Sequence, residues 1–264
     1  MKVGFFYQIW HTSQTAIFES LKQFRSVYPD NNLVLLITCV KKNKVEEYDN
    51  NFSNIIKKKF NISKIEYFYE EDYRWGYVAE GARDNYLKYT NNWLEKITTM
   101  PDDDVDFLVF AAEDWYVFKE LPIRYDCDVS GKYRSWDEWM NKKIKEKFDY
   151  SINIDILWFQ HGHYYNLNLL REKYTEENKN YITETLKELY PSNFILMPDY
   201  ILSVWNTHIF KNFYNADYIY EMPSETCDDT PLESFQKTDC YSVHGYKTLY
   251  GKPFTEEMKQ LGIK

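Results

Sequence analysis

The sequence predicts an α/β fold with a Rossmann-type sheet, in which central, mostly parallel strands are flanked by helices and a smaller irregular lobe follows. Strand and helix patterns alternate through the first part of the chain. Several of the predicted strands are continuous apolar runs, as expected for strands covered on both faces. The later part loses this regular alternation. An alternating order of this kind implies right-handed crossovers between parallel strands.

Five elements open the chain. Residues 3–9 (VGFFYQI) predict a strand, and residues 12–28 place apolar side chains at helical spacing before a proline. Residues 32–40 (NLVLLITCV) predict a second strand, residues 43–60 a lysine-rich helical stretch, and residues 64–70 (KIEYFYE) a third strand. The pattern up to this point is strand, helix, strand, helix, strand.

A further helix and a fourth strand complete this half, and less regular elements come after them. The helix covers residues 78–98, and the fourth strand comes from the segment PDDDVDFLVFAAED, which ends at Asp114. Beyond it we expect helices at residues 135–148, 175–190 and 199–214, strands at 152–159, 194–197 and 217–222, and a donor or acceptor loop at 160–166. Because no repeat or flexible linker interrupts the chain, we expect one domain over residues 1–264.

Composition limits the classes of function. The chain has 264 residues and a net charge of -9, which disfavours nucleic acid or an anionic membrane as the main partner because both require a basic face. The 4 cysteines show no metal or disulfide spacing. No apolar stretch approaches the roughly 18 residues that span a bilayer, and no signal peptide is evident. We therefore expect a cytoplasmic protein.

Two groups of acids flank the fourth predicted strand. In parallel α/β sheets, ligands bind outside the carboxyl ends of the strands. The aspartates of residues 102–106 precede the strand and are expected to form a solvated turn. Glu113 and Asp114 come after it, so they are the candidates for a ligand site.

The segment FLVFAAEDWYVFKELP, read together with the order of elements, resembles the acidic motif of the GT-A-fold nucleotide-sugar-dependent glycosyltransferases. The resemblance implies that Asp114 binds Mn²⁺ or Mg²⁺, hard cations that take oxygen ligands and bridge the phosphates of a UDP-sugar donor. Trp115 stands where that family often has another acid. A literal D-x-D at residues 126–128 ranks second, because no strong apolar strand precedes it.

The resemblance also implies a nucleotide-binding half at residues 1–120 and an acceptor-binding half at residues 121–264. Within RWGYVAEGARDNY it assigns Arg83 and Asp84 to the nucleotide, although both could be ordinary exposed helix residues. Tyr7 and Gln8 in the first predicted strand, together with Glu113, complete the expected nucleotide contacts.

The segment YSVHGYKTLYGK resembles the C-terminal histidine motif of the same enzymes. This implies that His244 is a second metal ligand and that Lys247 faces the diphosphate. A structural, hydrogen-bonding role for His244 is the alternative.

The segment SETCDDTPLESF corresponds to the place where inverting members of the family carry a general base. A base must lie within hydrogen-bond reach of the acceptor hydroxyl. We favour Asp229, then Asp228 and Glu233. Glu233 also fits a capping box with Thr230, which would leave it only a helix-stabilising role.

The resulting hypothesis is a metal-assisted, inverting transfer of a sugar from a UDP-sugar to a glycan or other hydroxyl acceptor. Two alternatives stay open. One is a catalytically silent GT-A-like module that binds a nucleotide or glycan. Trp115, which stands in place of an acid, supports this alternative. The other is a viral-type DNA glucosyltransferase, against which the acidic charge weighs.

Overall fold

The computed structural model of the chain describes residues 1–72, 81–133, 157–158, 162–196, 198–215, 219–221, 231–236 and 239–264. The helix predicted at residues 135–148, most of the strand predicted at 152–159, and the candidate bases Asp228 and Asp229 lie outside the described residues.

The first four strands form a parallel sheet in the order β3-β2-β1-β4. Their bounds are β1 (Val3–Trp10), β2 (Asn32–Val40), β3 (Lys64–Tyr69) and β4 (Phe107–Ala112). In register, Gln8 of β1 lies between Leu36 of β2 and Ala112 of β4. The first three strands agree with the predicted ranges to within one residue, and β4 lies inside the segment predicted for it, which confirms the predicted α/β class with a mostly parallel centre.

Short strands extend the sheet beyond β4 and build a second, smaller sheet. The main sheet continues with β8 (Tyr164–Asn166), β6 (Val129–Tyr133) and β7 (Leu157–Trp158), all antiparallel to their neighbours, and β9 (Phe213–Asn215) pairs parallel with β6. The smaller sheet has the order β10-β11-β5, from β10 (Ile219–Glu221), β11 (Ser242–His244) and β5 (Tyr116–Val117). The pairing of β5 with β11 brings the end of the chain to the segment that comes after β4.

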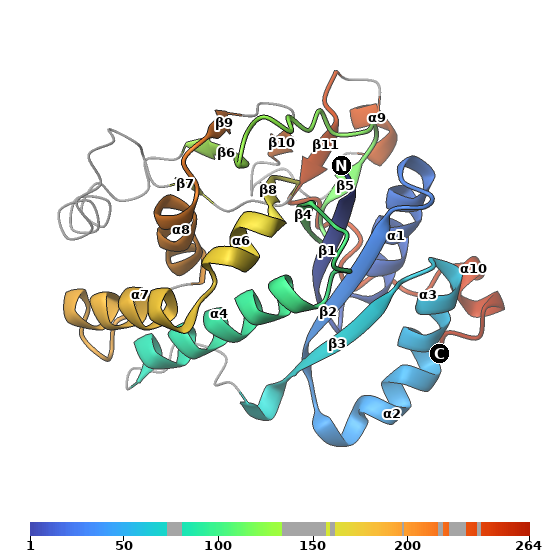
Figure 1. Ribbon diagram of the computed structural model, residues 1–264. Coiled ribbons are helices and arrows are strands. Elements are labelled where there is room, and N and C mark those ends of the chain that lie inside the picture. Colours follow the sequence, from blue (N-terminus) through green and yellow to red (C-terminus); the bar gives the residue numbers. More distant parts are fainter. Residues whose placement is uncertain are drawn as a thin grey trace.

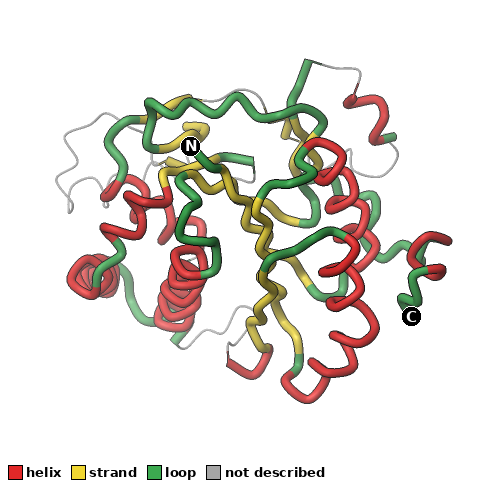
Figure 2. Tube along the Cα trace, turned by 45° about the vertical axis from the view of Figure 1, so that its right-hand side comes forward, coloured by secondary structure: helices red, strands yellow, loops and turns green. Residues whose placement is uncertain are grey.

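Helices cover both faces of the sheet (Figures 1 and 2). On one side lie α1 (Gln14–Val27), the irregular helical run η1 (Lys42–Lys44), α2 (Val45–Tyr48), η2 (Asp49–Ser53) and α3 (Asn54–Lys59), and the C-terminal α10 (Glu256–Gln260). On the other lie α4 (Ala82–Thr99), α6 (Leu167–Lys173), α7 (Glu176–Leu189) and α8 (Pro198–Ile209). The remaining short elements are η3 (Glu70–Asp72) and α9 (Leu232–Gln236). Each layer buries its own core cluster against the sheet.

Several predictions in the second half were wrong. Residues 194–196 form no strand, although Leu196 is buried as the apolar pattern requires. The segment predicted as a loop at 160–166 contributes β8, which pairs antiparallel with β4. A three-residue strand is too short to show an alternating apolar pattern. It becomes a strand by pairing with its partner, which the local sequence does not reveal.

Within the described residues, no helix is both long and apolar enough to cross a membrane.

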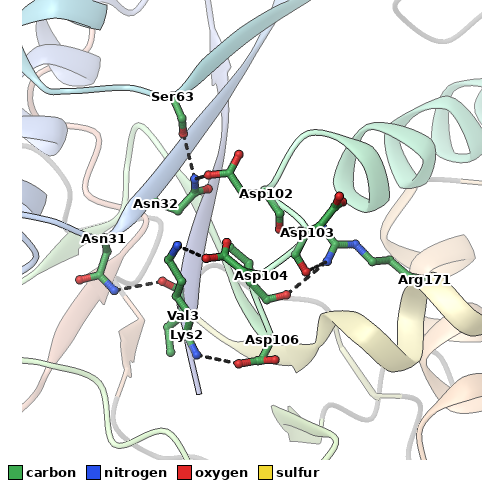
Figure 3. Close-up of polar contacts among 11 residues, drawn as sticks. Lys2, Val3, Asn31, Asn32, Ser63, Asp102, Asp103, Asp104, Asp106 and Arg171 are labelled. Carbon is green, nitrogen blue, oxygen red and sulfur yellow. Dashed lines mark hydrogen bonds and ion pairs between the residues drawn. The ribbon is translucent and has the colours of Figure 1, made fainter.

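The aspartates at the amino end of β4 include the exposed turn that the sequence predicts, at residues 103 and 104, and several of them also contact other parts of the fold (Figure 3). Asp106 accepts the backbone N–H of Lys2 at 2.8 Å, and Asp104 pairs with the Lys2 ammonium at 2.5 Å. Asp102 accepts the side-chain amide of Asn32. Arg171 donates to the backbone carbonyls of Thr98, Pro101, Asp102, Asp103 and Val105, at 3.0 to 3.4 Å.

Candidate active site

Two buried carboxyl groups lie at the carboxyl end of β4. Glu113 and Asp114 form the turn that joins β4 to β5, and their residues are only 7% and 8% exposed. The turn is closed by the Trp115 N–H, which donates to the Ala112 carbonyl at 3.1 Å. Burying two adjacent carboxylates is costly unless each finds a compensating partner, so their surroundings decide what they do.

Glu113 bridges β4 to the end of β1. The backbone N–H of Trp10 donates to Glu113 Oε1 at 3.3 Å. Burial, reinforced by the neighbouring charge of Asp114, raises the pKa of Glu113 to about 8. At neutral pH a proton is therefore held on Glu113 in the absence of a cation.

Asp114 has a different environment. Among the described residues, none donates a hydrogen bond to its buried Oδ1, and its ionisable partner is His244, whose Nε2 lies 3.7 Å away. The backbone also fixes this contact, because the Tyr246 N–H donates to the Asp114 carbonyl at 3.1 Å. The structure thus brings together the two residues assigned to the metal.

The β5–β11 pairing produces this contact. Val243 lies opposite Tyr116 in antiparallel register, so His244 leaves β11 at the point where the chain approaches Asp114. A carboxylate oxygen without a hydrogen-bond donor and an imidazole nitrogen fit a divalent cation chemically. No group of three or more His, Cys, Asp or Glu side chains suited to a metal occurs in the part of the chain that the structure describes.

Trp115 lies in the core and does not face the site. It is fully buried on the α1 side, with its ring 6.5 Å from that of Phe5 and 6.0 Å from that of Tyr7. The turn at Glu113 and Asp114 directs the next side chain inward. Any acid at position 115 would be buried among apolar rings, which explains why an aromatic residue stands there.

The second acidic motif has a structural function. Asp128 Oδ2 accepts the backbone N–H groups of Lys211 and Asn212 at 3.1 and 3.0 Å, where α8 leads into β9. Asp126 is exposed and pairs with Arg124 at 2.6 Å. These partners leave Asp114 as the acid best suited to a cation.

The two candidates on β1 differ from one another. Tyr7 is fully buried on the α1 side, where its ring lies 5.6 Å from that of Phe24, so the structure does not bring it to the sheet edge. Gln8 is half-buried nearer the carboxyl end of β1, and its amide donates to the Tyr89 hydroxyl of α4.

Arg83 links two helices, and Asp84 is its neighbouring ion-pair partner. The Arg83 guanidinium donates to the carbonyls of Lys187 and Tyr190 at 2.9 and 2.6 Å, at the carboxyl end of α7, and to Asp84 at 2.8 Å. The orphan carbonyls of a helix end favour such a cation. The described contacts of Arg83 therefore serve the packing of α4 on α7.

Lys247 and Glu233 are both exposed. Lys247 lies three residues beyond His244, in a turn closed by the Tyr250 N–H on the Lys247 carbonyl at 3.0 Å. Glu233 lies on α9, where it lines a hollow of about 670 Å³ together with Glu19 and Lys22 of α1. The capping box predicted for Glu233 stays a prediction, because its partner Thr230 lies outside the described residues.

Two site residues were missed in the sequence. Trp10 directly follows the first predicted strand, so the carboxyl-end rule contained a signal for it. Tyr250, whose pKa is raised by burial and by the nearby charges of Asp114 and Glu113, carried no such signal, because its approach to these acids depends on how the C-terminal segment returns to the sheet.

No protein-family profile and no curated protein sequence matches this chain. Its structure is similar to that of the galactosyltransferase LgtC in complex with donor and acceptor sugar analogs, with a TM-score of 0.52, 12% identity and coverage of 98% of this chain and 95% of that chain. An active-site mutant of LgtC gives 0.53 at 12% identity, covering 98% and 94%. Mouse xyloside xylosyltransferase 1 gives 0.47 at 9% identity, covering 97% and 100%. The chain has the GT-A fold of glycosyltransferases.

Proposed function

We propose that this chain is a glycosyltransferase that moves a sugar from a nucleotide-diphosphate donor, UDP-linked, to a hydroxyl group of a glycan acceptor. One observation carries the proposal: a buried Asp114 oxygen, which has no donor among the residues that the structure describes, lies 3.7 Å from His244 Nε2 at the carboxyl end of β4. In open α/β sheets this edge is where nucleotides bind. The fold shared with LgtC, a structure with donor and acceptor sugar analogs, agrees with this choice.

Asp114 and His244 are the residues that would hold Mn²⁺ or Mg²⁺. When bound, such a cation supplies Lewis-acid neutralisation of the charge that develops on the leaving diphosphate. His244 would hold the cation as a neutral imidazole, and Asp114 would contribute the negative charge. Lys247, exposed on the same C-terminal segment, is proposed to face the diphosphate.

The remaining step is an inverting displacement. The acceptor oxygen forms a bond to C1 of the sugar while the bond from C1 to the diphosphate oxygen breaks, and the diphosphate leaves with the electron pair. Asp229 takes the proton of the acceptor hydroxyl, with Asp228 and Glu233 as the alternative bases. The assignment of Asp229 rests on its place in the sequence. A single domain in the cytoplasm is likewise proposed from the sequence.

A nucleotide-binding module without activity is the second candidate. The buried Trp115 supports it, because position 115 offers no ligand and leaves Asp114 and His244 as the pair available for a cation.

One ligand screen and one subsequent turnover assay separate the two candidates. Thermal unfolding is measured with UDP, GDP and their sugar conjugates, each with Mn²⁺ and with EDTA. We expect stabilisation that requires UDP and metal together, because ligand binding to the folded state raises its stability. Release of UDP from the UDP-sugar then identifies a transferase. Stabilisation without turnover identifies the silent module, and a chain that no nucleotide stabilises would disprove both.

A further inference from the structure

We propose that Ser20 and Gln23 of α1 are positioning residues that set the place of the small sheet, and with it His244, relative to Asp114. Their side chains bond the backbone of the segment that follows Asp114. The inference rests on the proposed function for its consequence, because Asp114 and His244 are the residues proposed to hold the cation.

The two proposed metal residues come from different sheets. Asp114 lies in the turn after β4 of the main sheet, whereas His244 is the last residue of β11 in the small sheet. The distance between Asp114 and His244 therefore depends on how the small sheet is held against the main one. β5 is the link between them, because it begins two residues after Asp114 and pairs with β11.

β5 is an edge strand whose other edge is covered by a helix. It pairs with β11 on one side, and no strand within the described ranges pairs with it on the other. There, Ser20 Oγ donates to the Trp115 carbonyl at 2.8 Å, and Gln23 Nε2 donates to the Val117 carbonyl at 2.9 Å. Alternate carbonyls of a strand point to the same side, and residues three apart share one face of a helix. The two donors of α1 therefore take the place of a neighbouring strand.

The helix α1 is a firm support for β5 because it is packed against the main sheet. Ile17, Leu21 and Phe24 are fully buried in the same core cluster as residues of β1 and β2. Ser20 lies on this packed helix and is itself only 1% exposed. The position of the main sheet is thus passed to the small sheet through hydrogen bonds from α1.

Other contacts also attach β5, so the two donors determine its exact placement and not its presence. The Tyr116 hydroxyl donates to the Ala16 carbonyl at 3.4 Å, and the Phe118 N–H donates to the Tyr241 carbonyl at 2.8 Å. Without one of the α1 donors, β5 would stay attached but would keep a carbonyl that has lost its hydrogen bond, which is destabilising. We expect the strand to shift until that carbonyl finds water or another donor.

A small shift of β5 is enough to affect the proposed cation. It would displace Asp114 through the chain and His244 through the pairing with β11. Functional sites require their side chains to be held within about 0.5 Å, and groups that orient metal ligands contribute about 10-fold to 100-fold in metal affinity. Loss of either donor should therefore weaken binding of the cation without changing a residue assigned to it.

The test uses the full chain with Ser20→Ala, Gln23→Met and the double variant. Methionine keeps the length of Gln23 but has no N–H to donate. Ser26→Ala is the matched control, because the exposed Ser26 bonds only within α1 among its described contacts, to the Gln23 carbonyl at 2.6 Å. Arg171→Ala is the control for lost stability, since Arg171 donates to carbonyls near the amino end of β4.

Two quantities are measured for each variant. The first is the affinity for Mn²⁺ alone and for UDP with Mn²⁺, per folded molecule, by electron paramagnetic resonance and by titration calorimetry. The second is hydrogen exchange without ligand, in residues 116–118 and 242–244 and, for reference, in β1 to β3.

For each single variant we expect the affinity for Mn²⁺ with UDP to fall by about ten-fold. Exchange in residues 116–118 should become faster by a similar factor, beyond any change in β1 to β3. The double variant should bind more weakly than either single one. Ser26→Ala should match the wild type, and Arg171→Ala should lose stability while keeping its affinity.

Unchanged affinity in Ser20→Ala and Gln23→Met, at whatever loss of stability, would overturn the positioning role and leave the two bonds as ordinary packing contacts. Unchanged exchange in residues 116–118 would overturn it as well. If Ser20→Ala does not fold, the half-buried Gln23 decides the question. A wild-type chain that binds neither Mn²⁺ nor UDP would refute the proposed function, and exchange would still decide whether α1 holds β5 in place.

Discussion

The acidic residues at the two ends of β4 differ in their exposure to solvent and in the direction of their pKa shifts. At the amino end, Asp104 is exposed and its pKa is lowered by the hydrogen bond from the Lys2 ammonium. At the carboxyl end, Glu113 is buried and its pKa is raised to about 8, while Asp114 keeps an oxygen that no group in the described part of the chain donates to. Acids that have hydrogen-bond or ion-pair partners within the fold stabilise it. Buried acids that lack such partners indicate a place where a ligand could supply them.

The largest expected effect comes from Asp114→Asn. The amide keeps the shape of the side chain but removes its charge, so UDP-sugar turnover should fall by two orders of magnitude or more, within the several kcal/mol that charge neutralisation supplies. Initial rates of UDP release at saturating donor measure this. Asp126→Asn, at the exposed acid of the second motif, is the control and should retain its rate. Equal rates of UDP release for the two variants would disprove the proposed role of Asp114 in the active site.

Arg171→Ala should give the next largest effect, and it should act on stability. The change removes a guanidinium that donates to five carbonyls between α4 and β4, so we expect the free energy of unfolding to fall by about 3 kcal/mol. Urea denaturation measures the loss, and turnover per folded molecule should stay unchanged. Lys173→Ala on the same helix is the matched control, since Lys173 pairs only with its neighbour Glu172 among the described contacts. A similar loss in both variants would contradict the role of Arg171.

Glu113→Gln should change the pH dependence of stability in metal-free buffer. Because the pKa of Glu113 is raised to about 8 in the folded chain from its usual 4.5, the folded state holds a proton that the unfolded state releases. This contribution is complete below about pH 4.5 and is lost as the pH rises toward 8. Between pH 5.5 and 7.5 the wild type should lose about 2.5 kcal/mol relative to the glutamine variant, close to the limit of about 1.4 kcal/mol per pH unit. Parallel urea curves at both pH values would show that Glu113 is ionised throughout.

Asp104→Asn should give the smallest effect. Its partner Lys2 is exposed, and surface ion pairs contribute little to stability. Because the pKa of Asp104 is lowered, its contribution is present at neutral pH and is lost only as the pH falls through the acidic range, the reverse of Glu113. We expect the urea midpoint at pH 7 to stay within experimental error. A clear shift would mean that the acids of the amino end act together as one network.

The fold was largely predictable because its first half rests on local patterns. The apolar runs of β1, β2 and β4 and the helical spacing of α1 identify these elements without reference to any other part of the chain. The same order of elements predicts that a ligand would bind at the carboxyl end of β4. The short strands β5, β8 and β11 could not be found in this way, because each becomes a strand only through a distant partner.

The site residues also differ in whether the local sequence pattern or a distant contact decides their position. Glu113 and Asp114 were predicted from their position after β4, and the structure places them there. The structure buries Tyr7 in the core, and the sequence could not show this, because both faces of β1 are covered and alternation cannot tell which side chains reach the edge. Arg83 and Asp84 begin a helix whose amino end could have faced a ligand, but its neighbour α7 takes the guanidinium instead.

By itself, the sequence determined the parallel sheet, its helical layers and the acids at its carboxyl edge, since these depend on periodicity and chain order. Only the tertiary structure decided that His244 meets Asp114, that Glu113 holds the end of β1, and that Trp115 belongs to the core. Those outcomes depend on which distant segments pair as strands and on which side chains are desolvated by burial. The local sequence pattern predicts neither of these.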